Sequence, residues 1–131
     1  IKKHHQKALV LGTGGASRAV GYVLEKLGIS YSLVSRRNIR KQLSYKKLTA
    51  DIMNEHLLII NTTPLGTAPN IEECPDIPYE LLSSKHLLYD LVYNPAETEF
   101  LKRGKAKGAS IKNGMEMLHM QAEKSWEIWN S

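Results

Sequence analysis

The sequence has little cysteine and no long apolar run, and each shortage excludes a class of protein. The single cysteine, Cys74, has no partner for a disulfide within the chain, so a disulfide-stabilised scaffold is excluded and a reducing compartment is expected. Cysteine and histidine do not occur at the spacing of a metal site. No apolar segment approaches the roughly 20 residues of a membrane-spanning helix. We therefore expect a soluble, cytoplasmic domain without a bound metal.

An initiator methionine is also missing. The chain opens with a polar segment, Ile1 to His5, which does not fit a signal peptide. We expect a piece of a longer protein. The 131 residues are enough for one domain with a single hydrophobic core, and we predict one domain over residues 1–131.

The formal net charge of +5 raises the question of a nucleic-acid partner. The basic residues are spread over several segments, and aromatic side chains do not alternate with them as they do in single-strand binders. An anionic cofactor accounts equally well for a local basic cluster. We expect no nucleic-acid partner. A basic nucleic-acid-binding domain remains the alternative, and a filter-binding assay across salt concentrations separates the two.

Apolar runs that suit strands alternate with segments that suit helices, which is typical of βαβ units and a parallel sheet. Helix 16–27 is predicted from an apolar stripe that ends at Gly28, a residue suited to a helix C-terminus. The predicted fold class is α/β: a Rossmann-like, doubly wound, mostly parallel sheet with helices on both faces. The predicted strands cover 8–11, 31–34, 57–61, 87–92 and 109–111, and the other long helices cover 97–107 and 115–129.

Two stretches are harder to interpret. Between residues 38 and 56 we predict a short helix from Asn38 to Leu43 and another over 48–54. Residues 64–78 hold four of the five prolines and predict a loop, followed by a single helical turn at 78–82. The sequence contains no internal repeat or linker.

A glycine turn between the first strand and the first helix is the candidate ligand-binding segment. Residues 12–17 read GTGGAS. Gly12 permits the tight turn, Gly14 lets a pyrophosphate approach the backbone, and the small Ser17 lets the helix pack near the sheet. The helix start offers free N–H groups and a positive dipole end to phosphates. This context predicts a bound dinucleotide.

The end of the second strand indicates which dinucleotide. NAD binders place an Asp or Glu there for the ribose hydroxyls, but this chain has Ser35, Arg36 and Arg37, with Arg40 beyond. A guanidinium pairs with a 2′-phosphate, which a carboxylate would repel. The cofactor expected from this segment is NADP.

Five separated motifs together resemble the NADP-binding domain of shikimate dehydrogenase. The resemblance extends from about Lys7 to Trp129, nearly the whole chain. Each motif is modest alone, but their number and order make the resemblance specific. The motifs occupy residues 12–19, 35–40, 61–66, 90–101 and 113–122.

The resemblance implies a role for each matching position. Arg36 and Arg40 would meet the 2′-phosphate, with Ser35 beside the adenosine ribose. Gln121 would reach the substrate, which Tyr93 would also contact. Thr62, Thr63 and Pro64 would line the groove. Tyr93, Gly114 and Met117 would lie at the nicotinamide. The implied cofactor-binding residues are Gly12, Gly14, Gly15, Ala16, Ser35, Arg36, Arg37, Arg40, Thr62, Thr63, Pro64, Tyr93, Gly114 and Met117.

The sequence departs from the family pattern at three positions. Ser35 replaces an Asn, Arg37 replaces a Thr and Thr67 replaces a frequent Met. Because of the first two changes, the family pattern does not determine the individual contacts near the adenosine. Arg37 adds a positive charge that can compensate for the shorter polar side chain of Ser35.

The family is a two-domain enzyme that interconverts 3-dehydroshikimate and shikimate in aromatic amino-acid biosynthesis. Its catalytic Lys and Asp belong to an N-terminal substrate domain that would precede Ile1. No residue of this chain is assigned a catalytic role, and the chain alone is expected to be inactive. Two alternatives stay open: the cofactor domain of a quinate/shikimate dehydrogenase, and a non-catalytic nucleotide-binding module. The oligomeric state cannot be read from the sequence.

Overall fold

The computed structural model describes residues 6–35, 43–67, 69–91 and 97–113. Within these residues a six-stranded sheet has the order β3-β2-β1-β4-β5-β6, and every neighbouring pair is parallel. This order confirms the predicted Rossmann-like fold class. The strands are β1 (Lys7–Leu11), β2 (Ser30–Ser35), β3 (Leu43–Ser44), β4 (Leu58–Asn61), β5 (Leu87–Asp90) and β6 (Ser110–Asn113).

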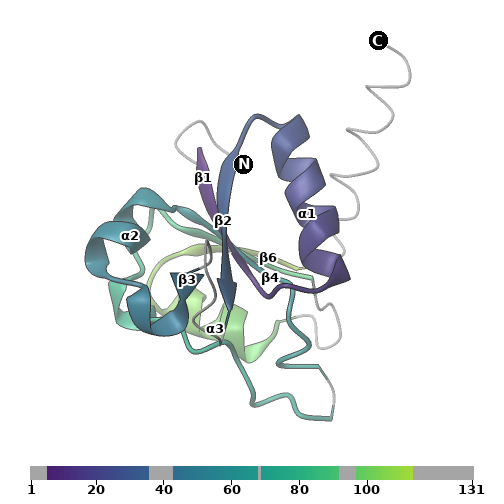
Figure 1. Ribbon diagram of the computed structural model, residues 1–131. Coiled ribbons are helices and arrows are strands. Elements are labelled where there is room, and N and C mark those ends of the chain that lie inside the picture. The colour runs from purple at the N-terminus through teal and green to yellow at the C-terminus, as the bar shows by residue number, and fades with distance from the viewer. Residues whose placement is uncertain (1–5, 36–42, 68, 92–96, 114–131) are drawn as a thin grey trace.

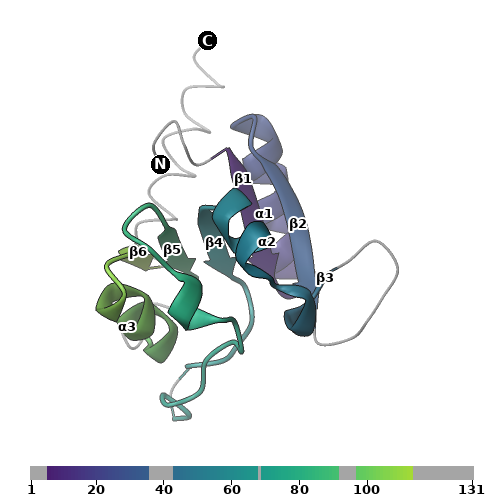
Figure 2. The same cartoon turned by 90° about the vertical axis from the view of Figure 1, so that its left-hand side faces the viewer.

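The helices cover both faces of this sheet, as predicted. Helix α1 lies on one face, while α2 and α3 lie on the other (Figure 1). Figure 2 shows α2 in front of the strands and α1 behind them. The described helices are α1 (Gly15–Lys26), α2 (Ala50–Glu55) and α3 (Glu99–Ala106), with single 3-10 turns η1 (Tyr45–Lys47) and η2 (Tyr79–Leu81).

Two hydrophobic cores follow from the alternation of side chains along the strands. On the α1 face, Val20 and Leu24 pack against β1 and β4. On the other face, Met53 of α2 and Phe100 of α3 belong to one cluster with Leu9 of β1. Each of these side chains is at most 2% exposed, and burying one such side chain contributes about 1.5–3 kcal/mol. The central strands are therefore fixed from both sides.

Helix α1 turns two small residues toward the sheet. Ser17 and Gly21 are buried on the same side of the helix as Val20 and Leu24. A Cβ built on Gly21 would lie 2.5 Å from the phenol oxygen of Tyr31 on β2. The ring of Tyr31 thus lies over Gly21, and a side chain at position 21 would require the phenol end of Tyr31 to move.

Most predicted elements are confirmed with shifts of a residue or two at their ends. The prediction for the segment around Leu43 is wrong: Leu43 lies in β3 and pairs with Val34, where a helix end was expected. A two-residue strand is held by its neighbour and has no hydrophobic period of its own. The expected helix 115–129 and the start of the expected helix 38–43 lie outside the described residues.

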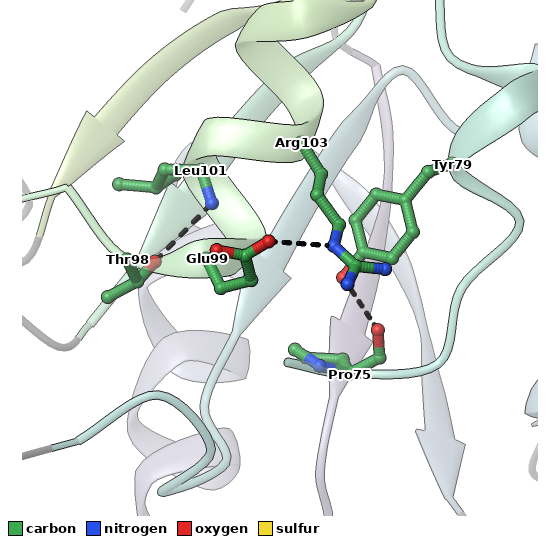
Figure 3. A network of polar contacts seen from close by, with 6 residues as sticks. All are labelled: Pro75, Tyr79, Thr98, Glu99, Leu101 and Arg103. Atoms are coloured by element: carbon green, nitrogen blue, oxygen red, sulfur yellow. Dashed lines mark hydrogen bonds and ion pairs between the residues drawn. The ribbon is translucent and has the colours of Figure 1, made fainter. Parts of the chain in front are cut away.

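The long proline-rich loop is docked onto α3 by a small polar cluster. Tyr79 donates to the carbonyl of Pro75 at 2.6 Å, and the guanidinium of Arg103 lies 5.3 Å from the Tyr79 ring centre (Figure 3). Burial raises the pKa of Tyr79 well above its ordinary value, so the phenol keeps its proton as a donor. Arg103 is itself paired with Glu99 at 3.1 Å. The cluster holds the far end of the loop that begins at Pro64.

Candidate functional site

The carboxyl ends of β1 and β4 lie side by side at the centre of the sheet. The chain leaves β1 toward β2 on one side and reaches β4 on the other, so the strand order reverses between β1 and β4. In open α/β sheets this reversal leaves a crevice in which ligands bind. The glycine turn follows β1 and the segment 62–64 follows β4. The fold therefore brings together two motifs that lie about 50 positions apart in the sequence.

Gly12 is held in place by both neighbouring strands. Its N–H donates to the carbonyl of Val34 on β2 at 2.8 Å, and its φ is +114°. A Cβ at this position would lie 2.6 Å from the hydroxyl oxygen of Thr62. That hydroxyl donates to the carbonyl of Leu11 at 2.6 Å. The fold itself thus requires glycine at position 12.

Gly14 and Gly15 differ from Gly12 because a Cβ at either would meet nothing within 4 Å. Gly14 has an ordinary φ of −84°, which any residue can adopt. Neither the packing nor the backbone of the described residues calls for glycine at position 14. We call this open space in front of Gly14 the cradle; a side chain would enter it, and without one a ligand can approach the backbone.

The start of α1 faces this cradle. Gly14 is the N-cap residue and provides no side-chain cap, and the first turn holds no acidic residue. Ser17 turns its hydroxyl back onto the Gly14 carbonyl at 2.6 Å, so that hydroxyl does not cap the helix start either. Uncapped N–H groups and the positive end of the helix dipole favour an anion. The geometry suits a phosphate group at the predicted place.

The segment after β4 lies against the glycine turn. Thr62 is tied to the end of β1 by two hydrogen bonds to the Leu11 carbonyl, from its N–H at 2.9 Å and from its hydroxyl at 2.6 Å. Thr63 is tied to the side chain of Asn61, and Pro64 begins the loop. The structure places Thr62, Thr63 and Pro64 together beside the glycine turn.

The other predicted site residues divide into two groups. Ser35 is the last residue of β2, buried and paired in register with Ser44 of β3. Its strand neighbours β1, so Ser35 lies on the same edge of the sheet as the glycine turn. The remaining predicted residues lie outside the described residues: Arg36, Arg37, Arg40, Tyr93, Gly114, Met117 and Gln121.

Two buried polar residues of the site were not assigned a role in binding from the sequence. Asn61 ends β4 and Asp90 ends β5, both fully buried and in register with each other. In the sequence, each of these polar residues ends a run of apolar residues, and this pattern could have marked both as candidates for the site. Their contact joins strands that are 29 positions apart, which no local pattern reveals.

A metal site and a membrane-spanning helix are both absent from the part of the chain that the structure describes. No group of three or more His, Cys, Asp or Glu residues there is arranged to hold a metal ion. Among the same residues, no helix has the length and apolar character to cross a membrane. A surface hollow of about 610 Å³ does exist, lined in part by Glu25, Gly28 and Tyr31, but it lies at the C-terminal end of α1, away from the glycine turn.

No family model matches the chain. Individual proteins do. The NADP(+) shikimate dehydrogenase of Desulforamulus reducens is 32% identical in an alignment that covers 95% of this chain and 49% of that protein. The enzyme of the same name from Halothermothrix orenii is 37% identical, over 94% of this chain and 49% of the relative. The chain thus spans about half the length of the relatives that it matches.

Solved structures give the same picture. Shikimate 5-dehydrogenase from Thermus thermophilus, in complex with NADP(H) and shikimate, matches with a TM-score of 0.70 and 32% identity, over 93% of this chain and 48% of that one. The enzyme from Listeria monocytogenes, in complex with shikimate and NAD, matches with a TM-score of 0.76 at 21% identity, over 96% of this chain and 51% of that one, and shows a similar fold only. Sequence and fold agree that this chain is homologous to the shikimate dehydrogenases, over about half of their length.

Proposed function

We propose that this chain is the NADP(H)-binding domain of a shikimate dehydrogenase and that residues 1–131 form that one domain. In the whole enzyme the cofactor supplies the hydride that reduces 3-dehydroshikimate to shikimate in the cytoplasmic biosynthesis of aromatic amino acids. The residues of this chain bind and orient the cofactor. The Rossmann strand order, the cradle at the glycine turn and the similarity to shikimate dehydrogenases support the proposal.

The open position at Gly14 is the observation that carries the proposal. Gly12 has a structural reason to be glycine, whereas Gly14 has an ordinary backbone conformation and free space in front of it. A phosphate that approaches the backbone there gives Gly14 a reason. We assign the pyrophosphate to Gly12, Gly14, Gly15 and Ala16, where the uncapped start of α1 stabilises negative charge.

The rest of the cofactor would extend from this point in two directions. Thr62, Thr63 and Pro64 would form the wall of the groove toward the nicotinamide, since this segment lies beside the glycine turn. For Tyr93, Gly114 and Met117 at the nicotinamide, and for Gln121 and Tyr93 at the substrate, the family motifs in the sequence are the support.

NADP is proposed over NAD because of the segment that follows β2. Complexes of both cofactors occur among the similar folds, so the fold by itself suits either one. Ser35 ends β2 without a carboxylate that would repel a 2′-phosphate, and Arg36, Arg37 and Arg40 follow in the sequence. These arginines would pair with the 2′-phosphate.

Calorimetric titration of the chain with NADP and with NAD tests the cofactor assignment. We expect weak binding of NADP and weaker binding of NAD, and tighter binding of NAD would contradict the role of the basic segment. Gly14→Ala is expected to weaken NADP binding at least about tenfold, because its methyl group occupies the cradle. It should lower the free energy of unfolding by no more than about 1 kcal/mol, because alanine is a poorer N-cap residue than glycine.

Gly28→Ala provides the matched control at the opposite end of α1. Gly28 has a φ of +74°, so alanine there should cost about 1 kcal/mol of stability. It lies far from the cradle and should leave NADP binding unchanged. If Gly14→Ala binds NADP as the parent does, the pyrophosphate does not lie at this turn.

The chain by itself is proposed to lack the catalytic groups of the enzyme. It corresponds to about half the length of its relatives, and the sequence offers no convincing acid–base pair. A steady-state assay of shikimate oxidation with the purified chain should give no turnover. Activity that co-purifies with the chain through further columns would refute this part of the proposal.

A further inference from the structure

Three buried polar side chains join the carboxyl ends of β4 and β5 to the start of α3. The amide nitrogen of Asn61 donates to one oxygen of Asp90 at 3.2 Å, and the hydroxyl of Thr98 donates to the other oxygen at 2.7 Å. All three residues have no exposed surface. Thr98 also caps α3 by accepting from the Leu101 N–H at 3.4 Å (Figure 3). The carboxylate therefore ties a strand end to a helix start.

The Asp90 carboxylate and the Thr63 N–H together determine which way the Asn61 amide points. An ionised carboxylate only accepts hydrogen bonds, so the amide must present its NH₂ group to Asp90. The amide oxygen then faces the opposite way, toward the segment after β4. There it accepts from the Thr63 N–H at 3.0 Å and from the Thr63 hydroxyl at 2.6 Å. The Thr63 hydroxyl in turn accepts from the Leu65 N–H at 3.3 Å.

We propose that Asp90 is a positioning residue for the cofactor groove, acting through the amide of Asn61 on the Thr63 turn. This inference rests on the proposed function, because Thr62, Thr63 and Pro64 form the groove wall only if the cofactor lies there. Asp90 contacts neither the cofactor nor the substrate in this role. Together with the Thr63 N–H, it holds a neighbouring amide in one of its two orientations, and the correctly oriented amide stabilises the backbone of the wall.

Packing alone does not explain this arrangement. Two apolar side chains of similar volume would join β4 and β5 without the cost of burying a carboxylate. What the Asn–Asp pair adds is direction, since Asn61 offers an acceptor on one side and a donor on the other. In Asp90→Asn the neighbour can present either an oxygen or an NH₂ group, so only the Thr63 N–H still selects the orientation of the Asn61 amide.

An exchange of the two side chains gives a sharp test. In the double variant Asn61→Asp/Asp90→Asn, the carboxylate now on β4 can accept from both Thr63 donors and from the amide now on β5. The oxygen of that new amide can accept from Thr98. Every hydrogen bond described above then has a counterpart at unchanged volume. In Asn61→Asp alone, two carboxylates would face each other, so this single variant is expected to be the least stable of the three.

Two measurements on the chain separate positioning from folding. Amide hydrogen exchange of Thr63 and Leu65 reports the turn without any cofactor, and calorimetry reports NADP binding. We expect Asp90→Asn to accelerate exchange at Thr63 about tenfold and to weaken NADP binding about tenfold, as for the loss of one charge-assisted hydrogen bond. The double variant should return both values to within about threefold of the parent.

The outcomes distinguish the inference from the proposed function. Parental exchange at Thr63 in Asp90→Asn would overturn the inference, as would a double variant no better than the single ones. A parent chain that does not bind NADP, together with faster Thr63 exchange in Asp90→Asn, would refute the proposed function and leave the orientation of the turn by Asp90 established. Faster exchange with parental NADP affinity would show that the wall does not touch the cofactor, and would overturn the inference.

Discussion

Replacing Gly12 with alanine tests the account of the glycine turn most directly, because the structure predicts two separate costs. The first is conformational: a residue with a side chain at a φ of +114° is strained by about 1–3 kcal/mol. The second is steric, since the new Cβ would lie 2.6 Å from the hydroxyl oxygen of Thr62. That hydroxyl must move and lose its hydrogen bond to the Leu11 carbonyl, which costs about 1 kcal/mol.

The sum predicts that Gly12→Ala lowers the free energy of unfolding by about 2–4 kcal/mol. Urea denaturation followed by circular dichroism measures this change from the shift of the transition midpoint between parent and variant. The substitution adds only a methyl group, and Gly14→Ala adds the same group two residues later at an ordinary φ in open space. The contrast between the two variants isolates the local geometry from the general effect of losing a glycine.

Thr62→Ala separates the two costs from each other. This variant removes the hydroxyl that the new Cβ meets, so the double variant Gly12→Ala/Thr62→Ala keeps the strain and loses the clash. We expect the double variant to be less destabilised than the sum of the single ones, with a coupling of about 1 kcal/mol. A Gly12→Ala chain within about 0.5 kcal/mol of the parent would refute the reasoning, because both costs would then be absent.

Two further predictions concern positions away from the turn. His86 is buried, with Nε2 2.7 Å from the Met53 carbonyl and Nδ1 accepting from the Ser83 N–H at 3.1 Å. Burial lowers the pKa of His86 below its ordinary value of about 6.5, so below this pH the unfolded chain takes up a proton at His86 before the folded chain does. The free energy of unfolding should therefore fall as the pH decreases from about 6.5 toward the folded-state pKa of His86. In His86→Gln this contribution to the dependence of the unfolding free energy on pH should be lost, as measured by urea titrations between about pH 8 and 5. An unchanged pH dependence in the variant would contradict the assignment to His86. The ion pair of Arg103 with Glu99 is solvent-exposed at an i,i+4 spacing. A double-mutant cycle should give a coupling free energy below about 0.5 kcal/mol, which should fall further in about 1 M salt. A coupling above about 1 kcal/mol would show that the pair is more than a surface contact.

Local patterns in the sequence were enough to predict most of the fold. The apolar run before Gly12 and the stripe of α1 bury residues at regular intervals, and such periodicity depends only on neighbouring positions. β3 was missed because its two residues gain their strand conformation from pairing with β2, which is a tertiary contact. The segment around Leu43 also shows that a short element has too few residues for a period.

Prediction of the site had a similar limit. The glycine turn and the segment 62–64 were each recognisable as motifs, but their meeting depends on the strand order β1-β4 at the centre of the sheet. From the motif, Gly12 was expected to permit the tight turn and Gly14 to let a pyrophosphate approach. The structure adds the contacts around each glycine, since Gly12 is required by the backbone and by Thr62, whereas Gly14 and Gly15 face open space.

The sequence by itself determined the alternation of strands and helices, the place of the glycine turn and the place of the basic segment after the second strand, because each depends on residues close together along the chain. The tertiary structure alone decided what surrounds these motifs. It brought Asn61, Asp90 and Thr98 into one buried group and turned the Asn61 amide toward Thr63. Hydrogen bonds between buried groups depend on distance in space and on the orientation of donors and acceptors, and neither quantity is written in the order of the residues.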